Sequence, residues 1–173
     1  MNIGILIKKP LSSIFENGCL QQSLFVYQTL SKIKGLNVSL VGFQENYEKL
    51  EHTDISIVNI YKKWEHIYQF NVIITLSGQF SEERVLKDLN KHNIKVIHYN
   101  CGNVYYIFQE DLIFNKHKHI EQIYHPNINT FFDEYWVIPN YKKDLDFYEN
   151  TFETFSRSIP YVWNSTIINK YLT

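Results

Sequence analysis

Side chains able to bind polar ligands gather in four loop segments of the sequence, each next to an apolar run or an amphipathic stretch. Amides and hydroxyls form hydrogen bonds with sugar hydroxyl groups, and glycine lets the backbone approach a ligand closely. These residues are Asn17, Gly18, Gln21 and Gln22 in the first segment, Ser77, Gly78 and Gln79 in the second, Asn100, Gly102 and Asn103 in the third, and Asn140 in the fourth.

The first segment, Asn17-Gly18, precedes a long amphipathic stretch. Free N–H groups at a helix start attract phosphate or carboxylate, and Gln21 and Gln22 in the first turn would add amide hydrogen bonds. The segment lacks the full GxGxxG pattern of a dinucleotide site. A plain Asn-Gly turn that leads into a helix explains these residues equally well.

The other three segments each have a structural explanation too. Ser77-Gly78-Gln79 fits a strand-to-helix turn capped by Ser81, which we favour over a contact role. Asn100 and Asn103, on either side of Gly102, suit sugar hydroxyls, although Asx turns are slightly favoured. Asn140 is best explained as a helix N-cap.

Histidines and carboxylates suggest acid–base or metal chemistry. His98 lies at the end of an apolar run and is the one candidate general base, although a partly buried structural histidine is the favoured interpretation. His117, His119 and His125 lie in a lysine-rich stretch that favours a solvated loop, so no metal site is expected. Asp133 and Glu134 are adjacent, and on a strand they would face opposite ways.

Short apolar runs alternate with amphipathic stretches along the chain, which predicts βαβ units. The predicted fold class is α/β, a single Rossmann-like domain with a mostly parallel sheet flanked by helices. Ligands bind at the carboxyl ends of the strands in such folds, so the loops above are the expected site. The predicted strands are Ile3–Ile7, Val38–Phe43, Asp54–Ile60, Val72–Leu76, Ile94–Tyr99, Asp133–Pro139 and Ile159–Trp163. The predicted helices are Cys19–Lys34 (stopped by Gly35), Tyr61–Tyr68, Ser81–Lys91, Val104–Asp111 and Tyr141–Phe155.

Composition excludes several classes of protein. The 173 residues carry a formal net charge of −1, which is unlike the basic surface of a nucleic-acid binder. No apolar run approaches the roughly 18 residues of a membrane helix, and the first residues do not resemble a signal peptide. With two cysteines and no CxxC unit, a reducing cytoplasmic location is expected.

In order along the chain, these segments resemble an uncharacterised bacterial family related to two-domain (GT-B-type) glycosyltransferases. The resemblance spans nearly the whole chain, and the Asp-Glu-x-Trp and Pro-x-x-Trp patterns are its most specific parts. Leu20 stands where the family has glycine. The five segments that carry the resemblance are Met1–Ile7, Ile14–Gln22, Cys101–Tyr105, Phe132–Pro139 and Ile159–Trp163.

The resemblance implies an amino-terminal, acceptor-side domain over residues 1–163, with residues 164–173 as an exit segment toward a second domain absent from the sequence. The implied partners are a sugar acceptor, a nucleotide-sugar donor and a second α/β domain or subunit. Glycosyl transfer would be metal-independent and would need no cofactor, the nucleotide sugar being the donor substrate. The resemblance leaves both an active and an inactive isolated chain open.

Two other functions remain open. The first is a non-catalytic domain of the same fold that binds sugar or assembles with a partner, because fold alone does not establish function. The second is a small-nucleotide or phosphate-binding Rossmann enzyme. That function predicts an acidic residue at the end of the second strand, where Gly42-Phe43-Gln44 stands instead.

Overall fold

A computed structural model of the chain describes residues 1–7, 17–42, 55–61, 63–76, 83–100, 131–138, 145–152 and 154–160. Its contacts divide these residues into two compact units, Met1–Asn71 and Val72–Pro160. Seven strands are described, and all of their pairings within the two units are parallel. Each unit is described separately below.

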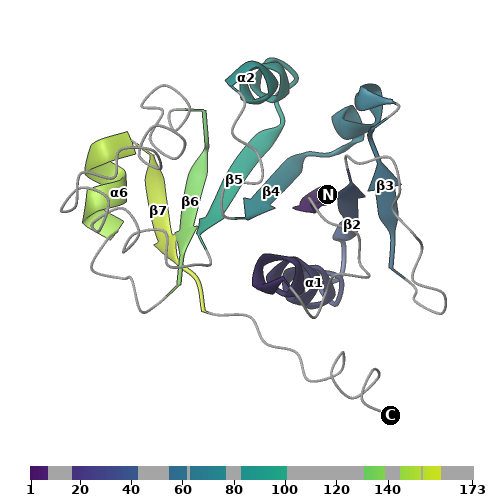
Figure 1. Cartoon of the computed structure of the whole chain (residues 1–173), viewed down its shortest axis with the longest axis horizontal. Coiled ribbons are helices and arrows are strands. Elements are labelled where there is room, and N and C mark those ends of the chain that lie inside the picture. The colour runs from purple at the N-terminus through teal and green to yellow at the C-terminus, as the bar shows by residue number, and fades with distance from the viewer. Residues whose placement is uncertain are drawn as a thin grey trace, which may run out of the picture. The chain divides into compact units, whose positions relative to one another are not determined.

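The first unit contains three strands, in the order β3-β2-β1. Ile5 on β1 pairs with Leu40 on β2, and Leu40 in turn pairs with Ile57 on β3. Figure 1 shows α1 alongside the β1–β2 ribbon. The elements are β1 (Asn2–Ile7), α1 (Gly18–Leu30), β2 (Asn37–Gly42), β3 (Ile57–Asn59) and the 3-10 helix η2 (Trp64–Gln69).

Apolar burial explains the elements of this unit. The side chains of β1 from Ile3 onward are buried, as expected of a parallel strand covered on both faces. Leu20, Leu24 and Tyr27 follow helical spacing along α1 and are all buried. The Tyr27 hydroxyl accepts a hydrogen bond from the Ser56 N–H at 3.0 Å, which ties α1 to the segment before β3.

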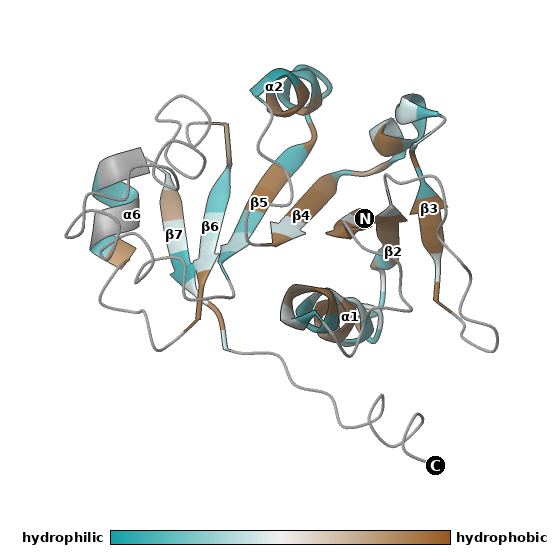
Figure 2. Ribbon diagram, viewed as in Figure 1, coloured by the Kyte–Doolittle hydropathy of each residue, from teal (hydrophilic) through white to brown (hydrophobic). Residues whose placement is uncertain are grey.

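The second unit contains four strands, in the order β4-β5-β6-β7. Figure 1 shows α6 beside β7, and α2 contacts β5. Figure 2 shows hydrophobic residues along β4 and β5 and a more polar β7. The elements are β4 (Val72–Leu76), α2 (Glu83–Lys91), β5 (Lys95–Asn100), β6 (Glu134–Val137), α6 (Leu145–Phe152) and β7 (Phe155–Ser158).

Local sequence signals position α2. Glu83 in the first turn pairs with Lys87 one turn later, and Leu86 and Leu89 are buried. Asn93 ends the helical turns with φ of 57°, and the Ile94 N–H donates to the Leu89 carbonyl at 3.0 Å. This is a Schellman-type ending, in which asparagine takes the left-handed position that glycine usually fills.

The predicted α/β fold class with a parallel sheet is confirmed. The predicted last strand is wrong, because β7 is Phe155–Ser158 and not Ile159–Trp163. Three of the four residues of β7 are polar and the fourth, Phe155, is exposed, so the sequence of β7 lacks the apolar pattern of a buried strand. The predicted helix Tyr141–Phe155 extends too far, since α6 ends at Phe152 and Phe155 begins β7.

The end of α1 also differs from its prediction. The helix ends at Leu30, and residues 31–35 continue as turns in place of the predicted helix to Lys34. Gly35 has φ of 89°, a left-handed conformation that suits glycine. Glycine therefore marks the end of this turn segment and lies five residues beyond the helix itself.

Candidate functional site

The start of α1 holds the first predicted group of ligand-binding residues. The Asn17 side chain accepts a hydrogen bond from the Leu20 N–H at 2.9 Å, so Asn17 is the N-cap of the helix. A Cβ atom added at Gly18 would meet no atom of the described residues within 4 Å, so none of these residues requires glycine there. Gln21 is half-buried, whereas Gln22 is 1% exposed and lies inside the unit.

The second group of predicted residues lies at the carboxyl ends of β4 and β5. Asn100 is the last residue of β5 and is 2% exposed. His98 lies two residues earlier, so both side chains are on the same face of the strand. The predicted residues Ser77, Gly78, Gln79, Gly102, Asn103 and Asn140 lie outside the residues that the structure describes.

Thr75 extends this polar face onto β4, and the sequence analysis missed it. Thr75 and His98 are partners in the register of the two strands, so their side chains share one face. Thr75 is 0% exposed. Among the described residues, neither Thr75 Oγ1 nor His98 Nδ1 has a hydrogen-bond partner, although both atoms are buried.

The ring of His98 is held by aromatic neighbours. Its centroid lies 5.0 Å from that of Phe132 and 5.2 Å from that of Tyr135. Burial lowers the pKa of the imidazole from 6.5 to about 4, because these surroundings disfavour the charged form. His98 is therefore neutral near pH 7, with one ring nitrogen that donates and one that accepts a hydrogen bond.

An unpartnered buried polar atom is costly, at about 1–3 kcal/mol, so proteins seldom retain one without a use. Thr75 and His98, as register partners on adjacent strands, place two such atoms on one face of the β4–β5 pair. A hydroxyl both donates and accepts, and so it matches a threonine hydroxyl and a neutral imidazole. We call Thr75, His98 and Asn100 the β4–β5 polar face.

The two adjacent carboxylates, Asp133 and Glu134, make separate contacts. Asp133 Oδ2 accepts a hydrogen bond from the Val96 N–H at 2.8 Å. Glu134 Oε1 accepts one from the Trp136 indole N–H at 2.9 Å. The two carboxylates therefore have different hydrogen-bond partners, and the absence of a paired acid–base role stays a prediction.

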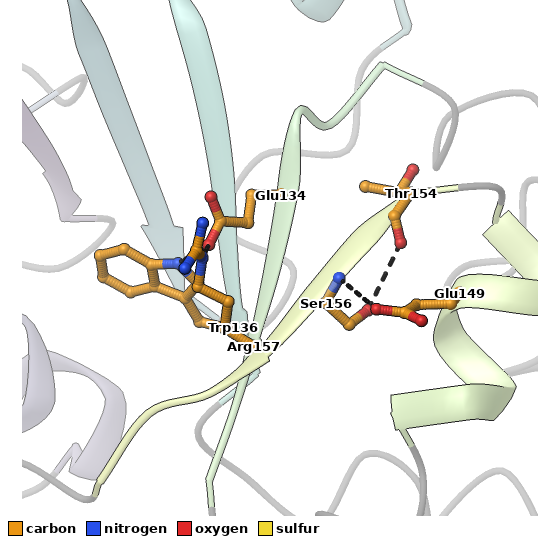
Figure 3. A network of polar contacts seen from close by, with 6 residues as sticks. All are labelled: Glu134, Trp136, Glu149, Thr154, Ser156 and Arg157. Atoms are coloured by element: carbon orange, nitrogen blue, oxygen red, sulfur yellow. Dashed lines mark hydrogen bonds and ion pairs between the residues drawn. The ribbon is translucent and has the colours of Figure 1, made fainter.

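Figure 3 shows two groups of polar contacts, one around Glu134 between β6 and β7 and one around Ser156 between β7 and α6. Arg157 forms an ion pair with Glu134 through its Nε atom. On β7, the Ser156 N–H donates to Glu149 Oε1 at 3.0 Å. The Glu134–Trp136 spacing of two residues could have indicated their contact, whereas Arg157 lies between the predicted helix Tyr141–Phe155 and the predicted strand Ile159–Trp163.

A metal centre finds no support in the described residues, since none of them form a group of three His, Cys, Asp or Glu side chains. His117, His119 and His125 fall outside the described ranges. In the described part of the chain, no helix is long and apolar enough to cross a membrane.

Comparison with known proteins gives a family but no described activity. No curated protein matches the chain. A protein family matches it over residues 1–173, the full length of the sequence. The chain therefore belongs to the family described as "Protein of unknown function (DUF2827)".

Proposed function

We propose that the chain is the acceptor-side domain of a glycosyltransferase-like protein, which transfers a sugar from a nucleotide sugar without a metal when completed by a second α/β domain. The β4–β5 polar face is the observation that carries this proposal. Its members lie toward the carboxyl ends of parallel strands, where α/β folds bind their ligands. The resemblance to GT-B-type proteins supplies the reaction type.

The chemistry of the polar face suits a sugar acceptor better than a charged ligand. Thr75, His98 and Asn100 present a hydroxyl, a neutral imidazole and an amide, and none of these carries charge near neutral pH. Such groups form hydrogen bonds with sugar hydroxyls and offer little attraction to a diphosphate. The donor's phosphates would then be bound chiefly by the second domain, and the cytoplasm would supply the donor.

His98 is the candidate for the general base that takes the proton of the acceptor hydroxyl. Its neutral form has a free lone pair, which a base requires. The low pKa makes it a weak base, because the ideal catalytic pKa lies near the working pH. This property favours a positioning role for His98 in the acceptor complex over strong proton abstraction.

The alternative is a non-catalytic domain of the same fold that binds sugar or assembles with a partner. One observation favours it: among the described residues, His98 Nδ1 has no hydrogen-bond partner that would orient the ring. In most histidine bases a third group fixes the tautomer. A binding domain requires no such group.

Titration of the purified chain with acceptor glycans and with nucleotide sugars tests the proposal, together with an assay for release of nucleoside diphosphate. We expect saturable acceptor binding that Thr75→Val and His98→Gln both weaken. His92→Gln, at the exposed histidine that directly follows α2, is the matched control and should bind like the wild type.

The same experiment separates the two functions. Glycosyl transfer by the chain would contradict the non-catalytic alternative. Absence of binding to every glycan and every nucleotide sugar would contradict the proposal. Equal weakening by His92→Gln and His98→Gln would show that the polar face is not the site.

A further inference from the structure

Arg157 on β7 is held in place from two directions. Its Nε atom pairs with Glu134 Oε1, the atom that also accepts the Trp136 indole N–H. Its guanidinium carbon lies 4.7 Å from the centroid of the Phe155 ring, a stacked cation–π arrangement. We call Glu134, Trp136, Phe155 and Arg157 the Arg157 cluster (Figure 3 labels three of the four).

The strand register explains why these side chains meet. Glu134 is the partner of Phe155, and Trp136 is the partner of Arg157. Residues two apart on a strand share a face, so all four lie on one face of the β6–β7 ribbon. Tyr135 lies between Glu134 and Trp136 on β6, so its side chain is on the opposite face from theirs. His98 is the register partner of Tyr135, so the β4–β5 polar face and the Arg157 cluster are on opposite faces of the strands.

Part of the guanidinium is left available. The contact with Glu134 is made through Nε. The Arg157 side chain is 56% exposed, and Phe155 is 55% exposed. A partly exposed ion pair contributes little to stability, so stability alone gives little reason for this arrangement.

The arrangement does favour binding. An arginine side chain loses considerable rotamer freedom when it engages a ligand, and the contacts with Glu134 and Phe155 have already restricted it. The two Nη groups present parallel N–H donors that match the two oxygens of a carboxylate or phosphate. Glu134 offsets part of the positive charge, so recognition would depend on the directed hydrogen bonds more than on net charge.

We propose that the Nη edge of Arg157 binds an oxyanion, a phosphate or carboxylate group of a small ligand, between the aromatic side chains of Trp136 and Phe155. This site does not depend on the proposed glycosyl-transfer function. Because one arginine supplies the hydrogen bonds, the affinity for the bare anion is weak, in the millimolar range.

NMR titration with inorganic phosphate, and separately with acetate, tests the site at constant ionic strength set with chloride. The Trp136 indole N–H is the reporter, since it shares Glu134 Oε1 with Arg157, and its loss in Trp136→Phe assigns the resonance. We expect a saturable shift with at least one of the two anions, and the tighter one identifies the ligand group.

Three variants make the result specific. Arg157→Gln should abolish saturation, and Arg157→Lys, which keeps the charge but loses the fork, should weaken binding by about fivefold, the loss of one hydrogen bond. Arg84→Gln removes the same charge from the exposed surface of α2 and should bind like the wild type. If neither anion saturates, or if Arg84→Gln and Arg157→Gln weaken binding equally, the site is disproved. Unchanged binding in Arg157→Lys would disprove recognition of the anion by two parallel N–H donors of the guanidinium.

Discussion

Thr75 and His98 are register partners on adjacent parallel strands, and each has a buried polar side-chain atom without a hydrogen-bond partner among the described residues. Both residues lie within three positions of the carboxyl end of their strand. The pair therefore combines an unsatisfied hydrogen-bonding capacity with the position at which α/β folds bind ligands. Four predictions follow from the local contacts of this pair and of two helix ends.

Thr75→Val should leave the fold intact and raise the free energy of unfolding by about 1 kcal/mol. Valine has nearly the same shape, and its substitution removes a buried hydroxyl whose desolvation is not compensated in the free protein. Urea unfolding measures the change. Thr29→Val, on the exposed surface of α1, is the control and should have little effect. A loss of stability in Thr75→Val would mean that the hydroxyl has a partner inside the protein.

His98 should make stability fall as the pH is lowered from about 6.5 toward 4. The pKa of His98 is about 4 in the folded protein and close to 6.5 in the unfolded chain, so the unfolded chain binds a proton first. Its contribution is fully present above pH 6.5 and declines by about 2–3 kcal/mol as the pH falls through 4. Neither Phe132 nor Tyr135, the rings against it, is charged in this range.

The comparison of wild type with His98→Gln isolates this contribution, because other groups also titrate below pH 5. Denaturant unfolding from pH 7.5 to pH 4 measures the free energy of unfolding of both proteins. As the pH falls, the wild type should lose more of this free energy than His98→Gln. An NMR titration of the imidazole provides a second reading. A His98 resonance that titrates near pH 6.5, as an exposed histidine does, would contradict the buried neutral ring.

Asn17→Ala should lower the free energy of unfolding by about 1 kcal/mol, because it removes the hydrogen bond from the Leu20 N–H to the N-cap side chain. Asn17→Asp and Asn17→Ser keep an acceptor oxygen and should retain most of the stability. Thermal or denaturant unfolding of the three variants gives the answer. Equal losses in all three would mean that capping does not explain Asn17.

Two small substitutions at Asn93 should have different effects on the free energy of unfolding. Asn93→Gly should be neutral or stabilising, since glycine accepts the left-handed conformation at φ of 57° without a Cβ penalty. Asn93→Ala should cost about 1 kcal/mol for the same conformation. Denaturant unfolding compares them, and alanine as stable as glycine would show that the turn relaxes.

Much of the fold follows from sequence periodicity. Val72–Leu76 is a continuous apolar run and is β4 to the residue. Ile3–Ile7 and Val38–Phe43 match β1 and β2 within a residue at each described end. In these elements burial and sequence pattern agree. A plain Asn-Gly turn that leads into a helix was one of two explanations of the first segment, and the structure adds that Asn17 caps this helix, a role that was not predicted.

The remainder could not be predicted from local pattern. The strand β7 contains Ser156, Arg157 and Ser158, which are held by pairing with β6 and not by apolar burial. The last strand was therefore predicted at the more apolar segment Ile159–Trp163. Thr75 was missed for a related reason, because it stands inside an apolar run and its relation to His98 depends on strand register. A histidine on one strand and a threonine on another become neighbours only when the sheet forms.

The central claim is that Thr75 and His98 bind a hydroxyl of a sugar acceptor. The most direct measurement is an NMR titration of wild type and Thr75→Val with acceptor glycans, following the His98 imidazole resonances. We expect a saturable shift in the wild type that Thr75→Val weakens about fivefold or more, the loss of one hydrogen bond, while its stability is maintained. A His98 resonance that no glycan shifts, or equal affinities of the two proteins, would contradict the claim.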